Sequence, residues 1–290
     1  MNKWIKRILT ILALAAAGYI AYIALCFFGN PVSKLLAKNA TEKYVAEKYP
    51  DCYITKVGYN FKNGDYYANV QKEGSTDINF FVYTDWFGNI GYDAYDSYVT
   101  EKQNTKSRMM MEYRALLDEA LPQDSVDFTL DIFFGDIVYE GIYEKYAYET
   151  YSEKIVGMPD EDVIIDGEYD YHDLGYKYGH VVLYACHEDV SIEKACEILL
   201  TVKEKLNDKN LGFYSIDFVL TKPRQKDGMP SEDETRINID YFLWDDIYED
   251  GLGERVQSAH DRLTEYYRQE DAKKQEFIQK VDEEFRRNNK

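Results

Sequence analysis

The sequence predicts an α+β protein that follows a single membrane-spanning helix. An uncharged apolar run occupies residues 8–28. Farther along, short alternating runs separated by glycine-containing turns indicate antiparallel strands, and segments with apolar residues at helical spacing lie between them. We divide the chain into a membrane anchor (1–29), a helix-plus-antiparallel-meander domain (30–122), a second α+β domain (123–253) and a long charged helix (254–290).

The first residues predict an N-terminal transmembrane helix. The apolar run Ile8–Phe28 follows three basic residues, Lys3, Lys6 and Arg7. Its 21 residues, at about 1.5 Å each, match a hydrocarbon core of about 30 Å. An uncleaved signal anchor is therefore the favoured interpretation.

Two alternatives to an uncleaved anchor stay open. Cleavage after Ala15-Ala16-Ala17 fits a signal peptidase pattern, but it would leave Gly18–Phe28 as an apolar N-terminus in water. Acylation of Cys26 is the other alternative, although Leu25 is larger than the residue that lipoprotein signals prefer before the cysteine.

Charge gives a weaker prediction of the orientation. Lys34, Lys38 and Lys43 nearly balance the basic residues on the N-terminal side. Large domains cross a membrane largely regardless of charge, and a basic segment before an apolar one resembles an export signal. We expect a short cytoplasmic N-terminus and an extracytoplasmic globular part.

Composition excludes one class of partner. Residues 31–290 contain 31 basic and 53 acidic residues, a formal charge of −22. Such a surface repels phosphates, so we expect no nucleic-acid partner. The chain also contains 28 Tyr and 14 Phe, which argues against disorder. Half-buried sheet positions are the favoured place for the tyrosines, with a glycan or peptide groove as the alternative.

The domain at 30–122 is predicted to begin with a helix. Asn30-Pro31 is a helix start and Tyr49-Pro50 a helix end. Four strands are expected to follow, and Asn63-Gly64 is a strong signal for the first hairpin turn. The strands are predicted at 52–61, 66–71, 77–84 and 90–92. A second helix at about 105–120 stops before Pro122. This order is similar to PepSY-like and cystatin-like modules, which bind or inhibit partners.

The second domain is predicted to mix strands and helices. A strand is expected at 126–134, where apolar residues alternate with polar ones. The remaining predictions are a helix at 137–155, a loop at 158–178, a strand at 180–186, a helix at 191–207, and paired strands at 213–220 and 235–243. For residues 254–287 we favour a helix that lies on its own domain at one end over a dimeric coiled coil.

Motifs for common chemistries are absent from the sequence. It has no G-x-S-x-G, P-loop, G-x-G-x-x-G, H-E-x-x-H or C-x-x-C pattern. His172, His180 and His187 lack the spacing of a zinc site. Cys186 and Cys196 are favoured as buried thiols over a disulfide pair. We therefore assign no catalytic, cofactor-binding or metal-ligating residue.

Acidic runs leave two alternatives. Asp160-Glu161-Asp162, Asp166–Asp173 and Asp245–Asp250 have oxygen ligands that suit calcium, although a loop centred on Gly251 fails as an EF-hand. A pair of carboxylates for hydrolysis also needs no local motif. A calcium-stabilised envelope domain and a cell-surface hydrolase using acidic residues are thus the alternatives to a binding protein.

Several motifs resemble one family. They are N-P-V-S-K-L-L-A-K-N-A at Asn30–Ala40, T-E-K-Y-V-A-E-K-Y-P at Thr41–Pro50, V-G-Y-N-F-K-N-G-D-Y-Y-A at Val57–Ala68 and F-V-Y-T-D at Phe81–Asp85. With the leader, they resemble the YfjL-like family of membrane-anchored proteins of Gram-positive bacteria, best over residues 1–120. The resemblance implies an extracytoplasmic, membrane-tethered protein and no assigned activity. We expect a non-enzymatic protein that binds an envelope protein or peptide.

Overall fold

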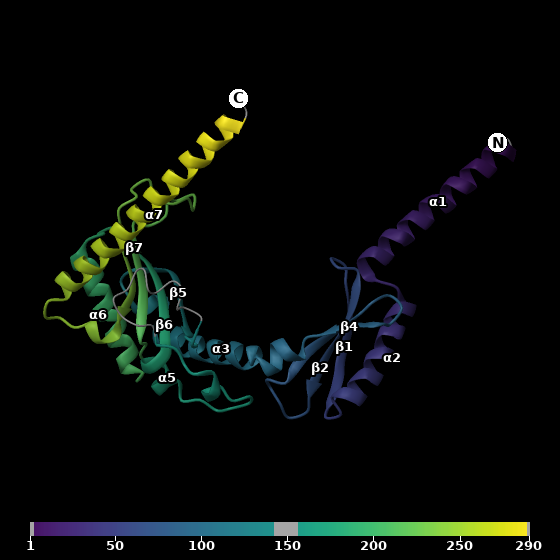
Figure 1. The fold of residues 1–290 in the computed structure, drawn as a ribbon, viewed down its shortest axis with the longest axis horizontal. Helices are drawn as coiled ribbons and strands as arrows, with labels where there is room; N and C mark the ends of the chain where they lie inside the picture. The colour runs from purple at the N-terminus through teal and green to yellow at the C-terminus, as the bar shows by residue number, and fades with distance from the viewer. Residues whose placement is uncertain (1–2, 142–155, 289–290) are drawn as a thin grey trace. The chain divides into compact units, whose positions relative to one another are not determined.

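The computed structural model describes residues 3–141 and 156–288, and within them the chain is α+β with two four-stranded sheets. It divides into two compact units (Figure 1). Unit 1 comprises Met1–Thr105 and Ile164–Gly167, and unit 2 comprises Lys106–Val163 and Glu168–Lys290. The predicted α+β class is therefore confirmed.

Unit 1 begins with the apolar helix α1 (Lys3–Phe28). By length and composition, it is the one helix of the described residues that qualifies for crossing a membrane, a criterion that a signal sequence also meets. Gly29, at φ +73°, turns the chain into α2 (Pro31–Lys48). The Asn30 side chain accepts a hydrogen bond from the Val32 amide and caps α2, as the Asn-Pro pair predicts.

A four-stranded antiparallel meander follows α2. Its strands are β1 (Cys52–Asn60), β2 (Asp65–Lys72), β3 (Asn79–Thr84) and β4 (Ile90–Asp93), in that spatial order. Alternate side chains of β2 and β3 are buried, and Val70, Phe80 and Val82 form a core with Val45 of α2. Burial of this apolar stripe fixes α2 on one face of the sheet.

The short π-helix η1 (Asp96–Thr100) and α3 (Gln103–Ala120) follow the meander. The boundary between the two units falls within α3, after Thr105. Met109, Tyr113 and Leu117 of α3 are fully buried in the core of unit 2. They recur at i and i+4, the spacing of one helix face.

Unit 2 is built on β5 (Thr129–Ile137), β6 (Gly179–Cys186), β7 (Ser215–Thr221) and β8 (Arg236–Leu243), in that order. The pair β6–β7 is parallel, and the other two pairs are antiparallel. A parallel pair needs a crossover, which α6 (Ile192–Asp208) supplies between them. Ser191 caps α6 by accepting from the Lys194 amide.

The last helix, α7 (Leu252–Asn288), is 37 residues long. Its first turns bury Leu252, Val256, Ala259 and Leu263. Farther along, Phe277, Ile278 and other large apolar side chains are exposed. His260 of α7 reaches the backbone of Asn238 and so covers the edge strand β8.

Three local predictions need correction. The alternation predicted over 126–134 is interrupted by a bulge between Leu130 and Ile132, so the inward face shifts to Phe133, Gly135 and Ile137. The predicted loop at 158–178 contains η3 (Asp160–Asp162) and α5 (Tyr171–Tyr178), whose N-cap is Asp170. Of the helix predicted at 137–155, Ile137 ends a strand instead, and 142–155 lie outside the described residues.

Candidate functional site

The face of the first sheet opposite α2 carries a row of aromatic side chains. Strand register places Gly58, Tyr67, Tyr83 and Tyr92 beside one another on four neighbouring strands. We call Tyr67, Tyr83 and Tyr92 the tyrosine row. Their neighbours Tyr66, Val82 and Thr84 are buried, so the alternation of the strands directs the row away from the core.

The rings of this face contact one another in a continuous array. Tyr83 stacks on Tyr92 with centroids 6.2 Å apart, and Phe81 lies 5.7 Å from Tyr67 and 6.0 Å from Tyr98. A Cβ at Gly58 would lie 2.4 Å from the Tyr67 ring, so this ring needs a glycine beneath it. The array is half-buried, apart from Tyr92, whose exposed fraction is 54%.

Burial changes the electrostatics of one phenol in the row, that of Tyr83. Burial, followed by the neighbouring Tyr98 and Asp65, raises the pKa of Tyr83 above its ordinary value. The Oδ1 atom of Asp65 is buried and accepts no hydrogen bond from the described residues. The exposed part of this surface offers ring faces and phenol hydroxyls that can donate and accept hydrogen bonds, which suits an amphipathic peptide group.

A second polar cluster lies on the sheet of unit 2. His180 Nδ1 is 2.9 Å from Ser215 Oγ, and His180 Nε2 is 3.3 Å from Asp217 Oδ2. The Tyr241 ring stacks on His180 with centroids 5.9 Å apart. Register aligns His180 with Ser215 across the parallel pair, which explains why His180 meets Ser215 and Asp217 of β7 although they are distant in the sequence.

These residue types are those of a catalytic triad, but the geometry favours a structural network. Ser215 is only 1% exposed, so its hydroxyl cannot meet a substrate. Tyr241 has φ +49° at the irregular end of β8, and its amide donates to Asp217 Oδ1 at 2.7 Å. Burial raises the pKa of Tyr241 to about 12, so its phenol is neutral. The cluster therefore holds a strained backbone in place.

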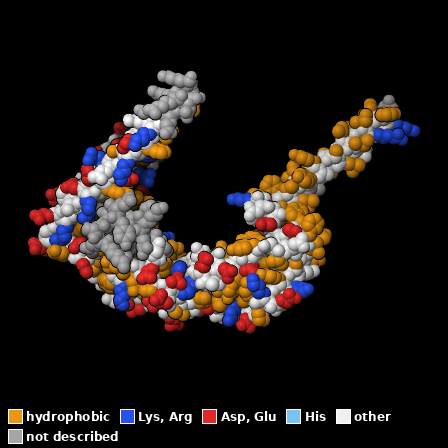
Figure 2. Space-filling view, in the orientation of Figure 1, with side chains coloured by type: hydrophobic (Ala, Val, Ile, Leu, Met, Phe, Trp, Pro, Cys, Tyr) orange, Lys and Arg blue, Asp and Glu red, His pale blue; other side chains and the backbone are white. Residues whose placement is uncertain are grey.

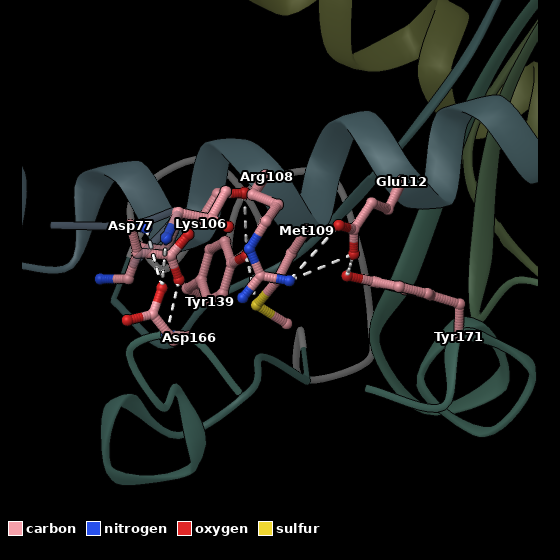
Figure 3. Close-up of polar contacts among 9 residues, drawn as sticks. Asp77, Lys106, Arg108, Met109, Glu112, Tyr139, Asp166 and Tyr171 are labelled. Carbon is pink, nitrogen blue, oxygen red and sulfur yellow. Dashed lines mark hydrogen bonds and ion pairs between the residues drawn. The ribbon is translucent and has the colours of Figure 1, made fainter. Parts of the chain in front are cut away.

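A third set of polar contacts lies along α3 in unit 2 (Figure 3). Lys106 Nζ is 2.8 Å from Asp160 Oδ1 and lies over the Tyr139 ring. Glu112 accepts a hydrogen bond from the Tyr171 hydroxyl and pairs with Arg108 at 3.3 Å. Burial and this bond raise the pKa of Tyr171. These contacts fix α5 and the segment before it to α3.

Within unit 1, Asp77 and Asp166 hold each other's backbone (Figure 3). Asp166 Oδ1 accepts from the amides of Thr76 and Asp77 at 2.8 and 2.9 Å, and Asp77 Oδ2 accepts from the Asp166 amide at 2.8 Å. Asp166 has φ +57°, a conformation that aspartate tolerates better than most residues. Asp166, in one of the acidic runs that suggested calcium ligands, thus has a defined structural role.

The other candidate ligands are not brought together. No group of three or more His, Cys, Asp or Glu that could hold a metal ion occurs in the part of the chain that the structure describes. Each of the four cysteines has a free thiol, and Cys186 lies 3.5 Å from the Thr221 hydroxyl. His172 Nδ1 contacts the Asn210 carbonyl, and His187 bonds within its own turn.

One cavity is lined by charged side chains of both signs, with Arg255 and Arg262 beside three carboxylates. It has a volume of about 610 Å³ at the start of α7, and Asp246, Asp250 and Glu254 line it. Arg255 also lines it and donates to the carbonyls of Asp246, Tyr248 and Asp250. The guanidinium is therefore committed to the turn before α7.

The sequence of each unit matches a known domain. Residues 1–94 match the YfjL-like N-terminal domain, and residues 112–257 match the YfjL-like C-terminal domain. The chain belongs to the YfjL-like family. The resemblance drawn from the motifs at Asn30–Asp85 is thereby confirmed. No curated protein matches this YfjL-like chain.

A solved structure is also similar to this YfjL-like protein. It is the crystal structure of a DUF5037 family protein from Ruminococcus gnavus ATCC 29149 at 2.55 Å resolution, with 15% sequence identity and a TM-score of 0.26. The similarity covers 77% of this chain and 98% of that chain. At these values it carries no argument about the activity of the YfjL-like chain.

The tyrosine row of this YfjL-like protein was not predicted from the sequence. Half-buried strand positions were expected for the tyrosines, but not that three of them lie side by side on neighbouring strands. The signal was present in the turns, because the Asn63-Gly64 hairpin pairs Gly58 with Tyr67.

Proposed function

We propose that this YfjL-like chain is a single-pass membrane protein whose two units lie outside the cytoplasm and bind an envelope protein or peptide without catalysing a reaction. The observation that carries the anchoring is the surface of α1. Fourteen large apolar side chains between Trp4 and Phe28 are exposed. Burying such side chains contributes about 1.5–3 kcal/mol each, so water is a costly environment for this helix.

The tyrosine row supports the binding part of the proposal. Its aromatic side chains are of the kind enriched in protein interfaces, and they form one contacting array. The buried Ser215 hydroxyl argues against hydrolysis at the His180 cluster. The formal charge of −19 for the chain argues against nucleic acid as the partner.

Protease accessibility on intact cells tests the location. The full chain carries an epitope tag after Lys290, and external protease is added before and after lysis. We expect digestion of the tag and both units on intact cells. Protection until lysis would place the units in the cytoplasm and contradict the proposal.

Photocrosslinking in living cells tests the binding surface. A photoreactive amino acid replaces Tyr92, and the matched control replaces Tyr267 of α7, which lies in unit 2 and is similarly exposed at 50% against 54%. We expect a discrete crosslinked band from position 92 and none from position 267. Equal patterns at the two positions would remove the tyrosine row as the binding surface.

A further inference from the structure

The end of unit 1 that joins α1 is formed by two sheet turns. In a meander, every second turn falls at the same end, so the β1–β2 and β3–β4 turns lie together. Phe61, in the first turn, lies beside Phe27 of α1 with ring centroids 5.9 Å apart. Trp86, in the other turn, donates from Nε1 to the Gly64 carbonyl at 2.6 Å.

The connection between α1 and this end is short and tightly packed. Only Gly29 and Asn30 separate α1 from α2. A Cβ at Gly29 would lie 2.7 Å from the Tyr59 ring. The Asn30 amide donates to the Tyr66 hydroxyl at 2.5 Å, and this hydroxyl donates to the Asn30 carbonyl at 3.0 Å. The end of α1 is therefore fixed to the sheet.

Large apolar side chains at this end face solvent. Phe28 is 83% exposed, Phe61 56% and Phe87 80%. Together with Phe27 and Trp86, we call these residues the aromatic collar. Hydrophobic side chains cover α1 and continue over the adjoining surface of unit 1 (Figure 2). The first turns of α2 add Val32, Leu35 and Leu36, all exposed. A contiguous apolar patch of this kind marks an interaction site.

The chemistry of the collar fits the surface of a bilayer. Aromatic side chains concentrate at the level of the headgroups, where one side of the ring is apolar and the other is wet. Lys34 and Lys62 adjoin the apolar positions in the sequence and suit anionic headgroups. Residues 30–105 contain 8 basic and 10 acidic residues, so unit 1 lacks the strong negative charge of the whole chain.

We propose that the aromatic collar lies in the interfacial layer of the membrane that α1 crosses, so that unit 1 is seated on the bilayer instead of moving freely on a tether. The proposal rests on the anchoring part of the proposed function. Continuity of the collar with α1 favours lipid over a protein partner, because the lipid that surrounds the helix end reaches the collar without any further binding event.

Fluorescence quenching by brominated lipid tests the seating. Phe87→Trp and the control Tyr53→Trp are made in the full chain, reconstituted in vesicles of phosphatidylcholine and phosphatidylglycerol. Tyr53 is 48% exposed near the start of β1, at the opposite end of the sheet. The emission of the parent, which has Trp4, Trp86 and Trp244, is subtracted. We expect brominated acyl chains to quench the emission added at position 87 and to leave that at position 53 unchanged.

Three other outcomes separate the two proposals. In the first, the protein floats with the vesicles, but aqueous iodide quenches the emission at positions 87 and 53 equally. This result would overturn the seating of the collar and leave the anchoring by α1 intact. Protection of position 87 from both quenchers would also overturn it, because a second copy of the chain, and not lipid, would then cover the collar. Failure of the full chain to float with vesicles would overturn the anchoring and the seating together.

Discussion

At the scale of single residues, the Asp93 carboxylate accepts hydrogen bonds from several side chains of unit 1. It lies at the end of β4 with its side chain 9% exposed, and it accepts hydrogen bonds from Lys48 Nζ at 2.8 Å and from the hydroxyls of Tyr49, at 3.1 Å, and Tyr44. Burial by itself would raise the pKa of Asp93, but the bonds from Lys48 and Tyr44 outweigh it and lower the pKa. The carboxylate thus ties α2 to the sheet.

Replacing this carboxylate should destabilise unit 1. Asp93→Asn removes a charge that Lys48 and two phenols share, and we expect a loss of about 1–3 kcal/mol in the free energy of unfolding at pH 7. Because the folded pKa is lowered, the stabilisation is complete above the unfolded pKa of about 3.9 and is lost as the pH falls through the folded value. The difference in the free energy of unfolding between the parent and Asp93→Asn should therefore shrink only at acid pH.

Denaturant unfolding of the full chain in detergent, followed from pH 7 to pH 3, measures both effects. Asp51→Asn is the control, because Asp51 is 78% exposed and its nearest cation is 3.9 Å away. If the difference in the free energy of unfolding between Asp93→Asn and the parent stayed constant down to pH 3, the lowered pKa of Asp93 would not contribute to stability as we expect. The sequence does not predict this ion pair, because Lys48 and Asp93 are 45 residues apart and only the packing of α2 on the sheet brings them together.

At the scale of elements, unit 2 depends on close approach between α3, α5 and the first two strands. The Tyr113 hydroxyl donates to the Gly212 carbonyl at 2.7 Å in a fully buried site. A Cβ at Gly135 would lie 2.9 Å from the Tyr113 ring, and one at Gly179 would lie 2.5 Å from the Tyr113 hydroxyl. Gly179 has φ −69°, so packing and not backbone freedom requires glycine there.

Gly179→Ala should therefore destabilise unit 2 through overpacking, by about 1–3 kcal/mol. Gly253→Ala is the matched control, because it lies in the first turn of α7 with nothing within 4 Å of the added Cβ. Alanine there should stabilise the helix by about 0.5–1 kcal/mol. Thermal unfolding of the full chain compares them.

A double-mutant cycle identifies the cause. Tyr113→Phe removes the hydroxyl that the new methyl group meets, so Gly179→Ala should cost less in the Tyr113→Phe background than in the parent. Strict additivity would contradict a clash with that hydroxyl and leave the Gly175 carbonyl, also 2.5 Å from the added Cβ, as the cause.

The elements themselves were largely predictable from the sequence. Periodicity located α3, β6, α6 and β8 within a few residues, because each buries one face or one stripe. The bulge at Leu130 and the slot around Tyr113 were not predictable, since both depend on contacts with distant strands. For the same reason, the tyrosine row could be recognised only from the register of the strands in the structure.

At the scale of the whole molecule, charge is divided unequally along the chain. Residues 30–105 have a net charge of −2, whereas residues 106–290 contain 23 basic and 43 acidic residues and have a net charge of −20. The formal charge averaged over both parts predicted a surface that repels phosphates, which applies to unit 2 and hardly to unit 1. Self-repulsion in the compact state should accordingly destabilise unit 2 alone.

Salt should reveal this difference. At 0.1 M salt, the Debye length is about 10 Å, so charges farther apart than this are largely screened. Raising the NaCl concentration should therefore weaken the self-repulsion of unit 2 and raise its melting temperature, while the melting temperature of unit 1 stays nearly unchanged. Thermal unfolding followed by pulsed hydrogen exchange reads each unit from its own peptides. Calcium and magnesium at the same ionic strength should act like NaCl if only screening operates. A larger rise with millimolar calcium, reversed by EDTA, would instead indicate a specific site and favour the calcium-stabilised alternative over simple self-repulsion.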